Sequence, residues 1–527
     1  MRAMASICFA GLLTLLESGC GGGTHTAPPP AAVSISTTSL ADGMVTFPYS
    51  QTILATGGVA PFVWSVPSGS LPHNVTLASS SVSSVALSGS PDTAQTATFT
   101  IQVKDSKNQN AAQAYTINIA PTGFVQLQAV PGQVPAGVVE IQGVAAGPFN
   151  PNYWQGNTLN WVPDVRIPMF AALTTGPWQN IYAPWALEQS TGWRMFYGGW
   201  DGTATSNDRI YSVSTPDFLS FNNRTLVIDH GDFLHVNNAN VTQLPDGSMH
   251  VICTTGIDNV IPGVANSKVA YFSSPDGITW NGTPEPYPAR ISDLITAIAN
   301  DPNYPGWDFN GGNVLLRDGN AWVLYYSVGI YGGIDKVFRA TSSSLPSFSK
   351  AGVALNTPHY SNDVKKFPAG GRNWYVMALY IERVTPDPTP PVFTFSLSND
   401  GITFGPEQNL FAGAFAADKF IQTPSFVTTG NSVLGVLYGA NPTDLLAATS
   451  QIFTRWLQKK IVFTDVSGTS YVPEGGYGPD RQWFQAPASG TLQGTIWVYA
   501  EDGITPLASG SMDVVGGKSY QLVLGGG

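Results

Sequence analysis

The pattern of apolar and polar positions repeats along the middle of the chain, from about Tyr182 to Phe463. Each unit opens with a short apolar strand, a tight turn of Gly, Asp or Asn, and an aromatic-rich strand that ends in small residues. A loop of variable length follows, then a strand that ends in Ser or Thr. The five units open with YAPWALEQ, NNANVTQL, NGGNVLLR, SNDVKKFP and FIQTPSFV. Repeats of about 40 to 50 residues with several strands each predict a β-propeller, here with five blades.

A second β pattern occupies residues 33–121, where TFTIQVKD and YTINIA alternate between Gly-, Pro- and Ser-rich turns. The stretches YSQTILATGGVAPFVWSVPSGSLP and LSGSPDTAQTATFTIQVKDS resemble the immunoglobulin-like domains attached to bacterial surface proteins. This resemblance implies a β-sandwich that has Trp64 in its core and serves as a spacer or in adhesion. Asp105 is of the type that binds calcium near strand ends in cadherin-like relatives, but one Asp with scattered Asn does not predict an ion.

Residues 464–527 alternate like three short strands, with turn signals at Asp502–Gly503 and Gly516–Gly517. They predict a small C-terminal β module. Residues 122–180 are aromatic and irregular, and we assign them to the propeller (122–463), either as a closing segment that adds an outer strand or as part of a binding surface. The predicted fold class is therefore all-β, with a five-bladed propeller between an immunoglobulin-like β-sandwich and this module.

The N-terminus contains a short apolar run, residues 7–16, that is too short to span a bilayer as a helix. The run leads to Cys20 and resembles the end of a bacterial lipoprotein signal, although Glu17 stands where such a signal normally has Leu. The resemblance implies a signal peptide over 1–20, a lipid on Cys20 and a flexible tether over 21–32. We expect an exported protein of the outer membrane, cell surface or periplasm that is held to a membrane by this lipid; plain secretion is the alternative.

Composition excludes some function classes. The net charge is −11 and no Lys/Arg cluster exists, which argues against nucleic-acid binding. Only 11% of residues are charged, and 56 Gly and 40 Pro suit a turn-rich, exported all-β protein. Once a signal peptide is removed and Cys20 carries lipid, Cys253 is the one cysteine with a free thiol. We therefore predict that Cys253 is a small buried residue and that the protein has no Cys-based metal site. We predict no cofactor, find no ligand motif for a structural calcium, and expect a monomer.

Ligand chemistry in a propeller collects on one face, where the first strands begin and the loops between second and third strands lie. Carboxylates there could act on a glycosidic bond, whereas amides hydrogen-bond sugar hydroxyls and flat aromatic rings pack against sugar rings. The candidate catalytic carboxylates are Asp308, Asp363, Asp201 and Glu382. The candidate saccharide-binding side chains are Trp185, Trp200, Asn240, Asn310, His235, His359 and Gln422. The expected partner is a poly- or oligosaccharide.

The stretch APWALEQSTGWRMFYGG resembles the first-blade opening of five-bladed glycoside hydrolases of family 43 and its relatives in families 32, 62, 68 and 130. SSPDGITW and SLSNDGITF are similar to blade ends in these families and to sialidase Asp boxes, and we expect Asp276 and Asp400 to form turns there. The resemblance implies hydrolysis by two carboxylates. The family 43 residues do not carry over, however, because Trp185, NNANV and FNGGNV stand where its acids are expected.

Three functions remain open. The leading hypothesis is a glycoside hydrolase, and the alternative is a non-catalytic propeller for carbohydrate binding or adhesion. The least favoured is a sialidase-like enzyme, which needs three Arg side chains to hold a substrate carboxylate. Available for that role are Arg194, Arg209, Arg339, Arg372 and Arg383, of which the first and third lie within predicted strands.

Overall fold

The structure of the protein is a computed structural model. It describes residues 31–525, except 122, 132–133, 173–178, 201–207, 232, 234, 257–266, 281–312, 331–332, 382–389, 444–448 and 488–489. The chain forms two compact units, Met1–Ala120 and Pro121–Gly527. Strands dominate both units, and one short helix, α1 (Pro151–Gln155), occurs in the described residues. None of the described helical segments is long and apolar enough to cross a membrane.

The N-terminal unit is a sandwich of two four-stranded sheets. One sheet has the order β1 (Ser34–Ile35), β3 (Tyr49–Thr56), β6 (Ser84–Gly89), β5 (Val75–Leu77). The other has the order β2 (Gly43–Met44), β8 (Asn110–Ala120), β7 (Gln95–Lys104), β4 (Val63–Gly69).

The sequence of this sandwich explains its core. Every second side chain of β7 is buried, including Phe99 and Ile101, as expected of a strand with one face toward a second sheet. Trp64 is buried as predicted, and its Nε1 donates to the Val82 carbonyl at 3.1 Å. Asp105 accepts hydrogen bonds from the backbone N–H groups of Val59, Lys107 and Gln109, so its carboxylate forms a turn.

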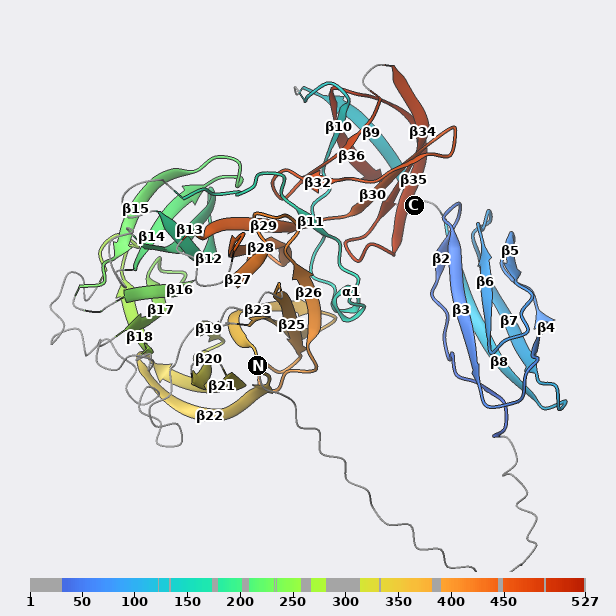
Figure 1. Cartoon of the computed structure of the whole chain (residues 1–527), viewed down its shortest axis with the longest axis horizontal. Helices are drawn as coiled ribbons and strands as arrows, with labels where there is room; N and C mark the ends of the chain where they lie inside the picture. Colours follow the sequence, from blue (N-terminus) through green and yellow to red (C-terminus); the bar gives the residue numbers. More distant parts are fainter. Residues whose placement is uncertain are drawn as a thin grey trace, which may run out of the picture. The chain divides into compact units, whose positions relative to one another are not determined.

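In the second unit, five sheets of three or four strands follow one another in chain order from β12 to β29 within the described residues. Figure 1 shows them around a common centre. The first two consist of β12 (Asn180–Gln189), β13 (Gly192–Trp200), β14 (Arg209–Thr215) and β15 (Asn222–Ile228), then β16 (His235–Gln243), β17 (Met249–Gly256) and β18 (Ser267–Ser274). The third consists of β19 (Val314–Asp318), β20 (Ala321–Ile330), β21 (Gly333–Ser344) and β22 (Ser347–Asn356). The last two consist of β23 (Tyr360–Ala369), β24 (Arg372–Tyr380), β25 (Val392–Ser398) and β26 (Gln408–Ala412), then β27 (Phe420–Thr429), β28 (Ser432–Asn441) and β29 (Gln451–Leu457) with β11 (Trp161–Pro163).

The first strand of each sheet faces the centre of the ring. β12, β16, β19, β23 and β27 contact one another in turn, and β27 returns to β12. Apolar clusters fill the space between each pair of neighbouring sheets, which is why both faces of the blades are hydrophobic. Cys253 of β17 is fully buried in one of these clusters, as predicted. These sheets are the blades of the predicted propeller, and we number them one to five in chain order.

A strand from before the ring completes the fifth blade. β11 pairs antiparallel with β29, with Trp161 opposite Leu457. β11 is thus an outer strand of blade five, which is one of the two alternatives left open for this segment. Segments from the two ends of the ring close it, which fixes blade five against blade one without a covalent link.

The C-terminal module contains strands that we did not predict for it. The module has two sheets. The first has the strand order β31 (Ser470–Tyr471), β30 (Lys460–Asp465), β34 (Thr491–Tyr499), β35 (Pro506–Val515). The second has the order β32 (Gly475–Gly476), β33 (Arg481–Gln485), β10 (Val138–Gln142), β36 (Lys518–Gly525), β9 (Phe124–Val130). β9 and β10, drawn in cyan in Figure 1, thus belong to this module and not to the propeller to which we assigned them. Pairing over more than three hundred residues leaves no local signal in the sequence.

One buried carboxylate joins the closing segment to both neighbours. Asp164 follows β11 and accepts hydrogen bonds from Trp456 Nε1 of blade five at 2.8 Å and from the Gly478 backbone N–H of the module at 3.1 Å. Arg166 donates to both of its oxygens and neutralises the charge. Asp164 therefore connects three segments that are far apart in sequence.

The predicted turn role of two aspartates is confirmed. In the blade ends that read DGIT, Asp276 Oδ1 accepts from the backbone N–H groups of Ile278 and Thr279, both at 2.8 Å. Asp400 makes the same pair of bonds in blade four, and these backbone donors hold the pKa of both carboxyls below the ordinary value. Asp502 repeats the turn in the C-terminal module.

We predict that Asp164→Ala lowers the free energy of unfolding by about 3–5 kcal/mol, because it leaves Arg166 and two other donors without their acceptor. Asp513→Ala serves as the matched control, since Asp513 is exposed on β35 and has one long hydrogen bond. Chemical denaturation followed by tryptophan fluorescence measures both. Equal stability of the two variants would contradict the role of Asp164.

Candidate functional site

The innermost strands of four blades share an irregularity near their starts. Their pairing register shifts between Tyr182 and Trp185, Asn237 and Asn240, Ser361 and Asp363, and Gln422 and Ser425. Three of the residues within these bulges have left-handed backbone conformations, namely Ala183, Asn238 and Thr423, with φ of 47°, 51° and 52°. A bulge of this kind bends the strand and redirects the side chains on either side of it. We call the level of the ring before these bulges the mouth.

Polar side chains from two blades meet at the mouth. Asn237 Nδ2 of blade two lies 3.3 Å from Tyr182 Oη of blade one and 3.4 Å from Asp208 Oδ2. Asp208 is held in place because its carbonyl accepts the Val236 N–H at 2.9 Å. A carboxylate, an amide and a phenol therefore converge there. We call Tyr182, Asp208, Asn237 and Asn238 the mouth cluster.

Two amide oxygens of the mouth cluster are buried without a partner. Oδ1 of Asn237 and Oδ1 of Asn238 accept no hydrogen bond from any described residue. Leaving a buried acceptor unsatisfied costs roughly 1–3 kcal/mol. Unpaired acceptors of this kind are suited to a ligand that donates hydroxyl groups.

His235 lies at the start of blade two, as expected. Its ring packs against Gly256 so closely that a Cβ there would lie 2.8 Å from His235 Cε1. Burial lowers the pKa of His235; the neighbouring Asp208 charge acts in the opposite direction, and His230 acts in the same direction as burial. A neutral imidazole beside Asp208 can donate one hydrogen bond and accept another.

Blade five contributes a second polar group. Gln422 Nε2 donates to Ser450 Oγ at 3.0 Å, and the Ser450 N–H donates to Asn180 Oδ1 at 2.8 Å. Thr423 Oγ1 accepts the Ala183 N–H at 3.1 Å and links blade five to blade one. Gln422 therefore lies at the mouth level, as predicted, in a network that spans the closure of the ring.

Asp363 occupies a different position from the one expected of a catalytic carboxylate. Its side chain is fully buried; Oδ2 accepts the Phe426 N–H of blade five at 2.7 Å, and Oδ1 lies 3.2 Å from Lys365 Nζ. Burial raises the pKa of Asp363, and Lys365 with the hydrogen-bond donors opposes that effect. In this structure the Asp363 carboxylate joins blade four to blade five.

Trp185 lies in the same layer, below the mouth. It is only 5% exposed, and its Nε1 donates to the Val241 carbonyl of blade two at 3.0 Å. Lys365 Nζ lies 3.6 Å from the centroid of the Trp185 ring, which is close enough for a cation–π interaction. Lys365 thus reaches from blade four to blade one. Trp185 packs in the ring and offers no open face to a sugar.

Three other candidates have partners of their own. Asn240 Oδ1 accepts the Leu315 N–H of blade three at 3.0 Å. His359 Nδ1 lies 2.7 Å from Glu407 Oε2, within a cluster of threonine hydroxyls. Trp200 is half-buried at the end of β13, opposite Asn180. Asp201, Asp308, Asn310, Glu382 and Cys20 lie outside the described residues, so their candidate roles stay predictions.

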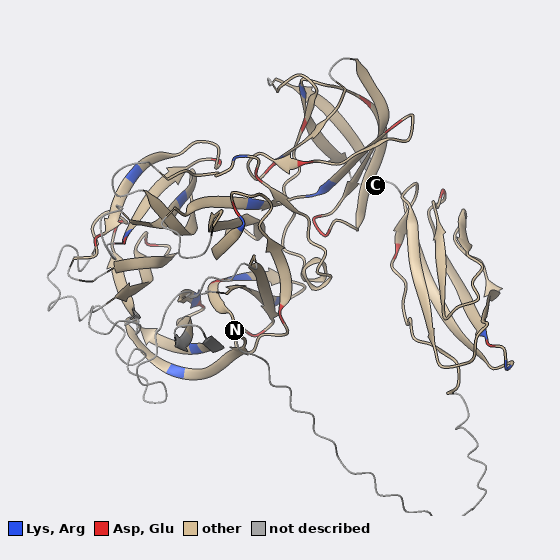
Figure 2. Ribbon diagram, in the orientation of Figure 1, with Lys and Arg blue, Asp and Glu red and all other residues tan. Residues whose placement is uncertain are grey.

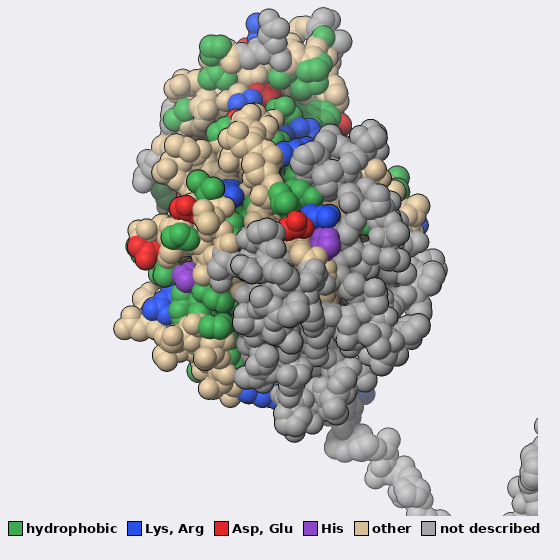
Figure 3. All heavy atoms as spheres, turned by 90° about the vertical axis from the view of Figure 1, so that its left-hand side faces the viewer, with side chains coloured by type: hydrophobic (Ala, Val, Ile, Leu, Met, Phe, Trp, Pro, Cys, Tyr) green, Lys and Arg blue, Asp and Glu red, His purple; other side chains and the backbone are tan. Residues whose placement is uncertain are grey.

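The arginines proposed for a sialidase do not converge where they are described. Arg194 donates to the Gly277 carbonyl at 2.7 Å, and Arg209 pairs with Asp229 at 2.8 Å. Arg372 begins β24, at the opposite end of its blade from the mouth. Figure 2 shows Lys and Arg dispersed over the ribbon, and Figure 3 shows basic, acidic and histidine side chains as neighbours on one face. Arg383 lies outside the described residues.

Among the described residues, no group of three His, Cys, Asp or Glu side chains is suited to hold a metal ion.

Tyr182, Asp208, Asn237 and Asn238 were not among the site residues that we predicted from the sequence. The available signal was the bulge itself. YAPW, NNAN and QTPS each place small or proline residues between two polar or aromatic positions. In blades one and two, Tyr182 and Asn237 before the bulge contact each other, and Trp185 and Asn240 after it bond to the next blade.

The protein has a weak structural similarity to solved glycoside hydrolase structures. Comparison with curated protein sequences gave no match. One glycoside hydrolase structure is 14% identical, with 58% of this chain and 95% of that chain covered and a TM-score of 0.43. A structure described with the family 130 glycoside hydrolases that target β-1,2 mannosidic linkages in Candida mannan is 10% identical, covering 57% and 94%, with a TM-score of 0.39. The Bombyx mori family 32 β-fructofuranosidase is 9% identical, covering 71% and 93%, with a TM-score of 0.41.

A family model matches the N-terminal unit. The matched residues are 28–120, and the family is described as "Putative Ig domain". The match covers nearly the same segment as the two-sheet sandwich around Trp64. The N-terminal domain is therefore immunoglobulin-like, as the sequence predicted.

Proposed function

We propose that the propeller binds a poly- or oligosaccharide at the mouth cluster and hydrolyses a glycosidic bond there. The observation that carries this proposal is the pair of buried, unpaired amide oxygens of Asn237 and Asn238 beside Asp208 and Tyr182. Sugar hydroxyls would donate to these acceptors, and a ligand that does so removes the cost of leaving them unsatisfied.

Hydrolysis requires a second carboxylate. In glycoside hydrolases the two carboxyl groups flank the scissile bond, about 5 to 10 Å apart. Asp208 supplies one group in our proposal. Asp201, Asp308 or Glu382, which the sequence places on the same face, supplies the other. Asp363 is not part of this pair, because its carboxylate is buried and bound to the backbone of blade five.

A non-catalytic carbohydrate-binding propeller is the second candidate. It is favoured by the make-up of the mouth cluster, in which amides outnumber carboxylates among the described residues. Asn237 and Asn238 can bind hydroxyl groups but cannot transfer protons as an acid and base. Turnover separates the two candidates.

We expect Asp208→Asn to lower kcat/KM for glycan hydrolysis by about 10²- to 10⁴-fold, because a general acid or base is removed. Asn237→Ala should mainly weaken binding, by roughly tenfold, since it removes one hydrogen-bonding group. Release of reducing sugar from a broad glycan panel measures the first effect, and calorimetric titration measures the second. Asp246→Asn is the matched control, because Asp246 lies in an exposed turn at the other end of blade two.

The results of this experiment distinguish hydrolysis from binding without turnover. Turnover that is lost in Asp208→Asn and kept in Asp246→Asn supports hydrolysis at the mouth. Glycan binding without turnover in the unmodified protein supports the second candidate. A protein that neither binds nor cleaves any glycan contradicts the proposal.

We also propose that the protein is exported and anchored through a lipid on Cys20, on the basis of the N-terminal sequence. Cys20→Ser should then move the protein from the membrane fraction to the soluble fraction, because one lipidation site is lost. Fractionation with immunoblotting measures this, and Cys8→Ser is the control. Membrane association that persists in Cys20→Ser counts against the anchor.

A further inference from the structure

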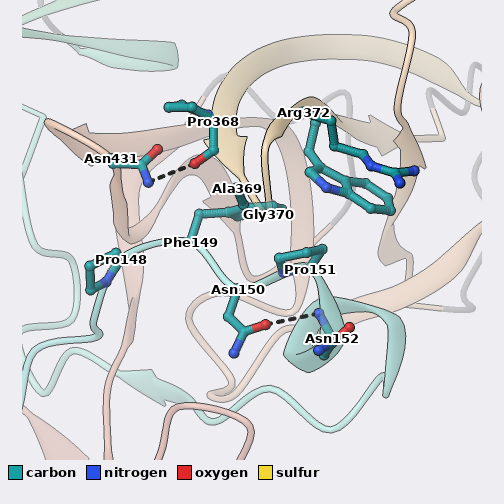
Figure 4. Close-up of a pocket in the computed structure, with 11 residues that line it drawn as sticks. Pro148, Phe149, Asn150, Pro151, Asn152, Pro368, Ala369, Gly370, Arg372 and Asn431 are labelled. Atoms are coloured by element: carbon teal, nitrogen blue, oxygen red, sulfur yellow. Dashed lines mark hydrogen bonds between the residues drawn. The ribbon is translucent and has the colours of Figure 1, made fainter.

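A pocket lies at the end of blades four and five that is remote from the mouth. It has a volume of about 670 Å³ and is lined by the β23–β24 turn, the β27–β28 turn and the segment that leads into α1. Figure 4 shows Asn431 and Pro148 on one side of it and Arg372 on the other, with Asn150 and Asn152 below. Along β23, Pro368 at this pocket lies seven positions after Ser361 at the mouth, which corresponds to roughly 23 Å.

Trp374 belongs to this pocket and to a neighbouring one. The second pocket, of about 300 Å³, is lined by Gln155 at the end of α1 and by polar residues of the β25–β26 turn, including Ser398, Asn399 and Thr403. The indole, which is half-buried, is a shared wall. We call the two pockets together the Trp374 groove.

The side chains that line the groove favour a negatively charged ligand. No Asp or Glu lines either pocket, and Arg372 is the charged side chain among the lining residues. Arg372 is exposed and makes no ion pair with any described residue, although the chain carries a net charge of −11. An unpaired guanidinium without neighbouring carboxylates retains its capacity to bind an anion.

A buried acceptor in the first pocket is also unsatisfied. Asn431 Nδ2 donates to the Pro368 carbonyl at 3.0 Å, which fixes the orientation of the amide. Asn431 Oδ1 is buried and has no partner among the described residues. A hydroxyl donor from a ligand would satisfy it.

We propose that the Trp374 groove is a second saccharide-binding site, which takes acidic saccharides. The indole of Trp374 provides a flat face for a sugar ring, and Asn431 Oδ1 accepts a hydroxyl. Arg372 binds the carboxylate of a uronic acid unit, for which its planar fork is suited. Because the groove lies at the end of the blades away from the mouth, it holds a polymer without occupying the mouth cluster.

The test is calorimetric titration of the full chain with a short oligogalacturonate and with a neutral oligogalactose of the same length. We expect Arg372→Gln to weaken oligogalacturonate binding by about tenfold and to leave oligogalactose binding unchanged, since one charge-assisted contact is lost. Rising salt should weaken oligogalacturonate binding in the unmodified protein and have little effect in Arg372→Gln. Trp374→Ala should abolish binding of both saccharides at this site.

Two controls keep the result interpretable. Arg317→Gln alters an arginine at the corresponding hairpin of blade three, where it stacks on Trp322, and should change nothing. Asn237→Ala alters the mouth and should leave oligogalacturonate binding intact, so failure of the mouth proposal is distinguishable. Absence of oligogalacturonate binding, or equal binding by Arg372→Gln, overturns the inference. Because Arg372 is exposed, this result does not depend on whether Trp374→Ala folds.

Discussion

The ring depends on hydrogen bonds from its innermost strands to the neighbouring blades. At every junction between neighbouring blades, a buried polar group on one inner strand bonds to the next blade. The bonds join Trp185 to Val241, Leu315 to Asn240, Ser361 to Ser327, Phe426 to Asp363 and Ala183 to Thr423. Each is worth about 1 kcal/mol net, but loss of either partner leaves a buried group unsatisfied at higher cost. Apolar clusters between the sheets supply the bulk of the stability, and these bonds set the register of the blades.

This constraint explains what sequence could and could not predict about the site. Trp185, Asn240 and Asp363 stand at matching positions after the bulges, and each has one polar atom bonded to the neighbouring blade, whereas the sequence suggested open binding groups. Composition cannot distinguish a buried Asp that accepts a backbone N–H from a catalytic one. The fold was more predictable, because the order of the blades and the DGIT turns follow from local patterns. The pairing of β9 and β10 with β33 and β36 was not, since it joins opposite ends of the unit.

The hydrogen bonds between blades lie between the mouth at one end of the propeller and the Trp374 groove at the other. Below the mouth, Lys365 of blade four reaches across to Trp185 of blade one, while Asn237 and Asn238 keep unpaired amide oxygens. At the far end, the groove around Trp374 lies outside the ring of inner-strand bonds, where Arg372 and Asn431 Oδ1 have no structural partner in the described chain.

The central claim is that the mouth cluster holds a saccharide. The most direct measurement is a crystal structure of the protein soaked with an oligosaccharide that it binds. The account predicts sugar hydroxyls within hydrogen-bonding distance of Asn237 Oδ1 and Asn238 Oδ1, with Asp208 beside the ring that they hold. A structure at saturating oligosaccharide in which both amide oxygens stay unpaired, whether or not the Trp374 groove is occupied, would contradict it.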